Sequence, residues 1–133
     1  MKKKKTLYLI AKVFISLFMF FSAYFSWSHP NDLRLLGFPD YFRIELVIAK
    51  VIGGILLLIP QTGRYLKEWI YAGFCICMVS AFIAHACSHD PVSKLFFVGF
   101  DFVLILVSIW QVRKYEYARS ENKFALINKE IVT

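Results

Sequence analysis

The amino-acid sequence predicts an all-α membrane protein, an antiparallel four-helix transmembrane bundle with both termini in the cytoplasm. Of its 133 residues, 59% are hydrophobic and only 19% are charged, an apolar share well above that of ordinary soluble domains. Four apolar segments are long enough to cross a bilayer, and the basic residues gather on one predicted face. A soluble domain this small would leave much of its apolar surface exposed to water.

Each apolar segment contains about 16 to 21 residues, against the roughly 20 that a helix needs to cross a ~30 Å hydrocarbon core. The segments do not alternate between apolar and polar residues, which excludes the strands of a membrane barrel. Prolines stand where helices begin or end. The segments are residues 7–27, 41–59, 69–87 and 95–110, and the prolines are Pro30, Pro39, Pro60 and Pro91.

The distribution of Lys and Arg predicts the orientation of the bundle. With the N-terminus inside, twelve of the 16 basic residues lie on the cytoplasmic side and three on the opposite side, while Lys50 lies within the membrane. The net charge of +7 therefore reflects topology, and we expect no nucleic-acid partner. Residues 1–112 form the predicted transmembrane domain. Residues 113–133 form a charged cytoplasmic tail, a helical extension that frays into a disordered end.

A cleaved signal peptide is a second interpretation of the first segment, because residues 2–5 form a basic start. The apolar run is longer than the ~7 to 15 residues of a signal core. Ser26 and Ser28 offer only a small-x-small pair as a cleavage site. We therefore expect a retained helix, and whether the segment is ever cleaved stays open.

Several ionisable residues share one predicted depth in the outer leaflet. Lys50 lies nine residues below Tyr41, or roughly 13 Å, and Asp101 lies about seven below Lys94, or roughly 10 Å. Such groups cost at least ~2.5 to 3.5 kcal/mol each near the bilayer centre, so they usually face the bundle interior. The candidates for ligand binding or proton handling are Glu45, Lys50, His85 and Asp101, and Ser22 and Ser26 end at a similar level.

Two interpretations of these residues remain open. Lys50 and Asp101 could form a buried ion pair that fixes helix packing, with His85 hydrogen-bonded nearby. We favour a binding or redox pocket, because four ionisable groups at one level exceed what packing requires. Gly73 and Cys77 begin a row of small residues that leads to His85 at four-residue spacing, which predicts a closely packed helix face.

The segment HACSHD raises the question of a metal site. His85 and His89 are four residues apart with Cys87 between them, so a helix end could present a metal pair. Only two ligands share a face, and we interpret His89 as an interfacial loop residue and predict no metal. Cys75 and Cys77 lie on opposite sides of a helix, and three cysteines provide no disulfide framework.

The segment YFRIE at residues 41–45, followed by AKVIGGILLLIP and LKEWIYAGFCICMVSAFIAH, resembles the DoxX-like family of small four-helix bacterial membrane proteins. The preceding LLGFPDYFR is similar to that family's entry into the second helix. The resemblance covers about residues 7–109, and the HACSHD end departs from it. The matching positions are Glu45, Lys50, Gly53, Gly54, Trp69, Gly73 and His85.

This resemblance implies a multi-pass protein of the bacterial inner (cytoplasmic) membrane. Relatives include a membrane subunit of a thiosulfate:quinone oxidoreductase. A quinone or a small sulfur compound is therefore the candidate ligand, and a soluble oxidoreductase is a candidate partner besides the lipid bilayer. The alternative is a non-enzymatic scaffold or assembly factor for another membrane protein. No residue pattern identifies a catalytic group, so whether the chain is an enzyme stays open.

Overall fold

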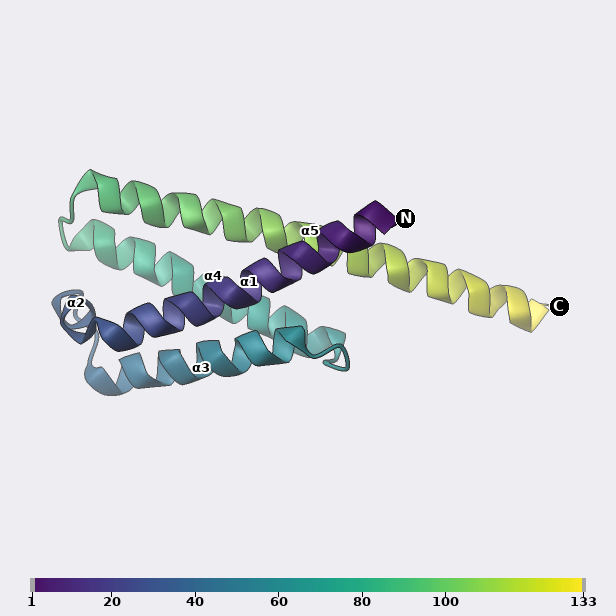
Figure 1. Cartoon of the computed structure of the whole chain (residues 1–133), viewed down its shortest axis with the longest axis horizontal. Coiled ribbons are helices and arrows are strands. Elements are labelled where there is room, and N and C mark those ends of the chain that lie inside the picture. Colours follow the sequence, from purple (N-terminus) through teal and green to yellow (C-terminus); the bar gives the residue numbers. More distant parts are fainter. Residues whose placement is uncertain (1, 133) are drawn as a thin grey trace.

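The computed structural model describes residues 2–132, which contain helices and no strands. In chain order the helices are α1 (Lys2–Ser28), α2 (Pro30–Leu35), α3 (Asp40–Leu58), α4 (Arg64–Cys87) and α5 (Val92–Val132). The long helices α1, α3, α4 and α5 lie alongside one another (Figure 1). The connections from α1 to α3 and from α4 to α5 lie together at one end of the molecule, the α2 end. The turn from α3 to α4 lies at the other, the Pro60 end.

Helix ends follow from proline and from left-handed turns. Pro30 occupies the start of α2, and Gly37, with a φ of 86°, follows its end. The Phe38 N–H donates to the Leu33 carbonyl at 3.0 Å, which completes a Schellman turn. The sequence predicts only a connection across residues 28–40, so α2 is an element that hydropathy does not reveal.

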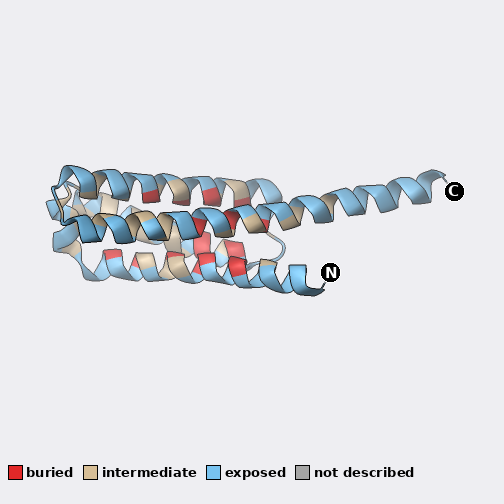
Figure 2. Ribbon diagram, turned by 90° about the horizontal axis from the view of Figure 1, so that it is seen from above, coloured by how far each residue is buried: buried red, intermediate tan, exposed pale blue. Residues whose placement is uncertain are grey.

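Helix α1 is the centre of the packing. It packs most extensively against α3 and also against α5, while α4 packs on α5 and has little close contact with α3. The buried residues lie on the sides of the long helices that face one another (Figure 2). A Cβ on Gly53 would come within 2.8 Å of Met19, and one on Gly54 within 2.9 Å of Phe20. The glycine pair therefore allows the close approach of α1 and α3.

Helix α5 continues beyond the bundle. It has 41 residues, which at 1.5 Å per residue is about 61 Å, roughly twice the hydrocarbon thickness of a bilayer. Figure 2 shows its far part leaving the bundle with exposed residues on all sides. The disordered end expected within residues 113–133 is therefore wrong for residues 113–132, which are helical, and Thr133 lies outside the described residues.

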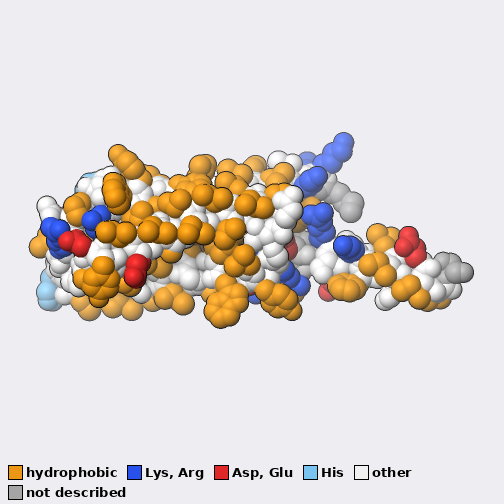
Figure 3. All heavy atoms as spheres, turned by 90° about the horizontal axis from the view of Figure 1, so that it is seen from below, with side chains coloured by type: hydrophobic (Ala, Val, Ile, Leu, Met, Phe, Trp, Pro, Cys, Tyr) orange, Lys and Arg blue, Asp and Glu red, His pale blue; other side chains and the backbone are white. Residues whose placement is uncertain are grey.

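The surface is typical of a protein in lipid. Within residues 2–132, three helices, α1, α4 and α5, are long and apolar enough to cross a membrane. Helix α3 is not among them; it carries Asp40, Arg43, Glu45 and Lys50 in 19 residues. Figure 3 shows hydrophobic side chains over the middle of one face and basic side chains gathered near the N-terminus. These features indicate a membrane protein.

Candidate functional site

Lys50 of α3 reaches across to α1 and is held there by two hydroxyl groups. Its Nζ donates to the Ser22 Oγ at 2.9 Å and to the Ser26 Oγ at 3.3 Å. No carboxylate forms an ion pair with Lys50 within residues 2–132. An ammonium has three N–H donors. The side chain is therefore a partly buried cation with neutral partners and one donor to spare.

A cavity of about 280 Å³ lies beside Lys50. Its walls are apolar apart from Lys50 itself, the Cys77 thiol and the indole N–H of Trp69. Small-molecule sites commonly combine apolar walls with a few convergent polar groups. The cavity is lined by Met19 of α1, by Leu46, Ala49, Lys50 and Gly53 of α3, and by Trp69, Ile70, Gly73, Phe74 and Cys77 of α4.

The other predicted site residues do not join Lys50. Glu45 is exposed, Asp101 is partly buried, and neither side chain forms a hydrogen bond or ion pair within residues 2–132. The ion pair between Lys50 and Asp101, one of the two interpretations of the sequence, is not formed. His85 is also engaged elsewhere, with Asp90. Of the residues expected at one depth, Lys50, Ser22 and Ser26 are brought together by direct contacts.

His85 and Asp90 form a pair at the end of α4. His89 has a φ of 54°, and the Asp90 N–H donates to the His85 carbonyl at 3.4 Å, so the chain turns back on itself. This turn brings the Asp90 Oδ2 within 2.6 Å of the His85 Nδ1. The hydrogen bond with His85 holds the pKa of Asp90 below its usual range. Within residues 2–132, no three His, Cys, Asp or Glu side chains are placed to hold a metal ion.

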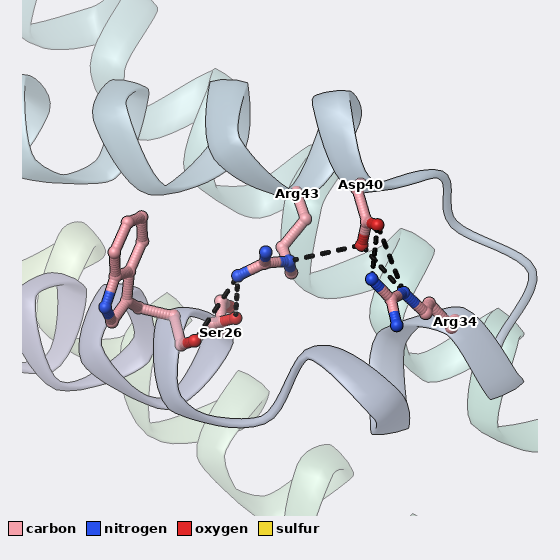
Figure 4. A network of polar contacts seen from close by, with 5 residues as sticks. Ser26, Arg34, Asp40 and Arg43 are labelled. Atoms are coloured by element: carbon pink, nitrogen blue, oxygen red, sulfur yellow. Dashed lines mark hydrogen bonds and ion pairs between the residues drawn. The ribbon is translucent and has the colours of Figure 1, made fainter.

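Arg43 fixes the start of α3 against the end of α1. Its guanidinium donates to the carbonyls of Ser26 at 3.4 Å and Trp27 at 3.3 Å, which lack partners within their own helix (Figure 4). Asp40 lies between Arg43 and Arg34 in the same view. Its hydrogen bonds with Arg34 lower the pKa of Asp40 and raise that of Arg34. This network sets the register that places Lys50 beside Ser22 and Ser26.

A second polar group at the Pro60 end, the Glu116 cluster, comprises Tyr8, Lys12, Lys67, Tyr71 and Glu116. The Glu116 Oε1 accepts a hydrogen bond from the Tyr8 hydroxyl at 3.1 Å and lies 3.1 Å from the Lys67 Nζ. Lys12 and Lys67 are only 7% and 8% exposed. Glu116 also interacts electrostatically with Lys12 and Tyr71. One carboxylate of α5 thus joins α1 and α4.

The sequence does not predict the Glu116 cluster, because each of its residues has a different interpretation when the sequence is read alone. Lys12 and Lys67 serve as topology markers, and Glu116 falls in the predicted tail beyond residue 112. One signal is available: Tyr8 and Lys12, like Lys67 and Tyr71, are four residues apart and so share a helix face.

Comparison with known proteins identifies the family. The model of the DoxX-like family matches residues 10–110, well over half of the chain. The matched range includes Lys50 and the residues that line its cavity, and it ends before Glu116. No curated protein and no solved structure matches the chain. The match confirms the resemblance seen from residue 41 onward, and the chain belongs to the DoxX-like family.

Proposed function

We propose that the chain crosses the bacterial inner membrane four times, with both termini in the cytoplasm and α3 as the fourth span. In support, three of the four charges of α3 lie in sites that suit a span, while Glu45 is exposed. Asp40 and Arg43 lie in its first turn, and Lys50 is bound to hydroxyl groups of α1. The α2 end is then the outer end, and the excess of Lys and Arg at the Pro60 end is inside.

The proposed function is that of a membrane subunit of a redox system that binds a quinone or small sulfur compound beside Lys50. One observation carries this proposal: among the described residues the Lys50 ammonium has no carboxylate partner, and it borders a largely apolar cavity. A charged group within the membrane that lacks an ionic partner commonly marks a functional site. A ligand oxygen would accept the remaining Lys50 N–H.

The other candidate residues take narrower roles in this proposal. Asp101 and Glu45, whose carboxyl groups have no hydrogen-bond or ionic partner within residues 2–132, are the candidates for proton handling. His85 lies on the same helix as Cys77 but is engaged with Asp90, so its contribution is to the outer end of α4. Lys50 is thus the residue whose removal tests ligand binding.

The test is purification in mild detergent followed by mass spectrometry for co-purifying quinone and protein. The wild-type protein should retain ligand, and Lys50→Met should lose it while eluting as the same folded species. Lys123→Met, at an exposed lysine of α5, is the matched control. A folded Lys50→Met variant that retains the ligand, or complements a deletion strain fully, would remove the redox proposal.

One feature favours the scaffold alternative. The part of α5 outside the bundle exposes apolar side chains, among them Phe124 and Ile131, which are 67% and 75% exposed. An isolated helix of this length is marginal in water, so a protein partner would stabilise it. Truncation after Ser120 keeps Glu116 and tests this role: loss of a co-purifying protein with retained ligand would assign the extension to partner binding.

A further inference from the structure

We infer that the ligand of the Lys50 cavity enters sideways from the lipid, between α3 and α4, and is a lipid-soluble molecule with a hydrogen-bond-accepting oxygen head. The inference rests on the proposed function of the cavity as a ligand site. It selects between the two ligand classes of that proposal, since a small sulfur anion is soluble in water and not in hydrocarbon.

The contact between α3 and α4 is the loosest between consecutive long helices. Helix α1 packs along α3, and α4 packs along α5, while α3 and α4 make few close backbone contacts. The cavity lies in this seam, with walls from α3 and α4. The packing therefore leaves an opening between two helices that have little else to hold them together.

The cavity extends from the core of the bundle to its outer surface. Met19 and Gly53 form a buried floor, whereas Ala49, Trp69 and Gly73 of the lining are exposed. Trp69 is 76% exposed, and a Cβ on Gly73 would meet no atom within 4 Å. In a bilayer these exposed lining residues face hydrocarbon, so the opening is a lateral one.

Buried side chains fill the routes along the bundle axis. Toward the Pro60 end, Ile15 and Leu57 are fully buried in the core. Toward the α2 end, Ser26 is buried and Arg43 spans from α3 to the carbonyls at the end of α1. A solute from either aqueous side would have to displace these groups, while a solute in the lipid would not.

The cavity also specifies the shape of the ligand. Its volume of about 280 Å³ is just below the roughly 300 to 1,000 Å³ of small-molecule pockets. It has room for a ring-sized head, with the apolar remainder of the molecule lying along α3 and α4 in the lipid. The head presents an oxygen to Lys50, because the ammonium donates and cannot accept.

Trp69 provides a direct readout at the rim of the cavity. In proteoliposomes, Trp27→Phe and Trp110→Phe leave Trp69 as the single tryptophan. A benzoquinone with a ten-carbon tail should quench its fluorescence saturably, above the linear collisional background. Lys50→Met should weaken that saturable binding roughly ten- to a hundredfold, as expected for the loss of a charged hydrogen-bond donor. Thiosulfate added to both aqueous sides should not displace the quinone.

Gly73→Leu tests the route itself, because its side chain would block the opening without a clash at Cβ. It should abolish or slow saturable quenching, whereas Ala72→Leu, an exposed neighbour outside the lining, should not. Binding that is unchanged in a folded Gly73→Leu variant overturns lateral entry. Displacement by thiosulfate overturns the ligand class. If the quinone does not bind saturably and thiosulfate does not change the Trp69 fluorescence either, the proposed function is overturned as well.

Discussion

Lys50 and Lys67 are lysines on neighbouring helices that meet the cost of burial in different ways. Lys67 is 3.1 Å from the Glu116 carboxylate, which also accepts a hydrogen bond from Tyr8 of α1. In the part of the chain that the structure describes, Lys50 is held by hydroxyl groups alone, and it borders a cavity. A buried cation with its counter-ion in place is tied to that partner, whose removal is costly, whereas we propose that one without a counter-ion is available to a ligand.

The two lysines also lie in parts of the bundle that are packed differently. Helices α1 and α4 make no close backbone contact, so Glu116 of α5 connects them through Tyr8 and Lys67. The proposed ligand site at Lys50 requires the opposite arrangement, a loosely packed seam between α3 and α4. The molecule is therefore tied together at the Pro60 end and left loose beside Lys50.

The clearest result is expected from an experiment on membrane topology, which tests on which sides of the membrane the Glu116 cluster and the Lys50 site lie. Reporter fusions after Thr133 and after Gly63 should report cytoplasm, and fusions within residues 31–37 should report the outside, because Lys and Arg concentrate at the Pro60 end. This result would place Glu116 on the inner side and Ser22 and Ser26, the partners of Lys50, toward the outer side. A C-terminus outside the cytoplasm would contradict the four-span topology and reverse the comparison.

The next largest effect concerns the Glu116 cluster. Glu116→Leu leaves Lys12 and Lys67 buried without their carboxylate, and breaking such a pair typically costs about 3 to 5 kcal/mol. We expect a clear fall in the thermal unfolding midpoint in detergent. Glu121→Leu, at an exposed position of the same helix, should change it little. Equal midpoints for the two variants would show that the cluster does not hold α1 and α4 together.

Lys50→Met should have a much smaller effect on stability, within about 1 kcal/mol. The substitution removes two hydrogen bonds to serine hydroxyls but also removes a cation that is costly in the membrane. The same thermal unfolding measurement, run beside Lys67→Met, checks the contrast. A loss for Lys50→Met as large as that for Lys67→Met would assign Lys50 to the structure and favour the scaffold alternative.

The smallest effect on stability is expected from the pair of His85 and Asp90 at the α2 end of the molecule. The pKa of Asp90 is lowered by His85, so its contribution to stability is complete above the unfolded value of about 3.9 and is lost as pH falls through the lower folded value. The unfolding midpoint should therefore drop slightly more between about pH 4 and pH 3 in wild type than in Asp90→Asn. Asp32→Asn, at an exposed aspartate of α2, is the control. Identical acid profiles for wild type and Asp90→Asn would leave this pair without a role in stability.

The sequence by itself determined the all-α class, the apolar segments and the family. Hydropathy and proline act locally, so they mark α1, α3, α4 and α5 without knowledge of their neighbours. Depth along a helix is also local arithmetic, which is why Lys50 was expected at the level of Ser22 and Ser26, its partners in the structure.

Only the tertiary structure decided which of the residues at one depth face one another. The rotation of each helix is set by packing against its neighbours, so equal depth did not bring Asp101 or Glu45 to Lys50, and His85 turned to Asp90. The Glu116 cluster is the opposite case, a set of residues that the sequence did not group and that the tertiary structure brings together. Its carboxylate belongs to a helix that runs past the last apolar segment, and it found its partners on α1 and α4 because those helices converge on α5.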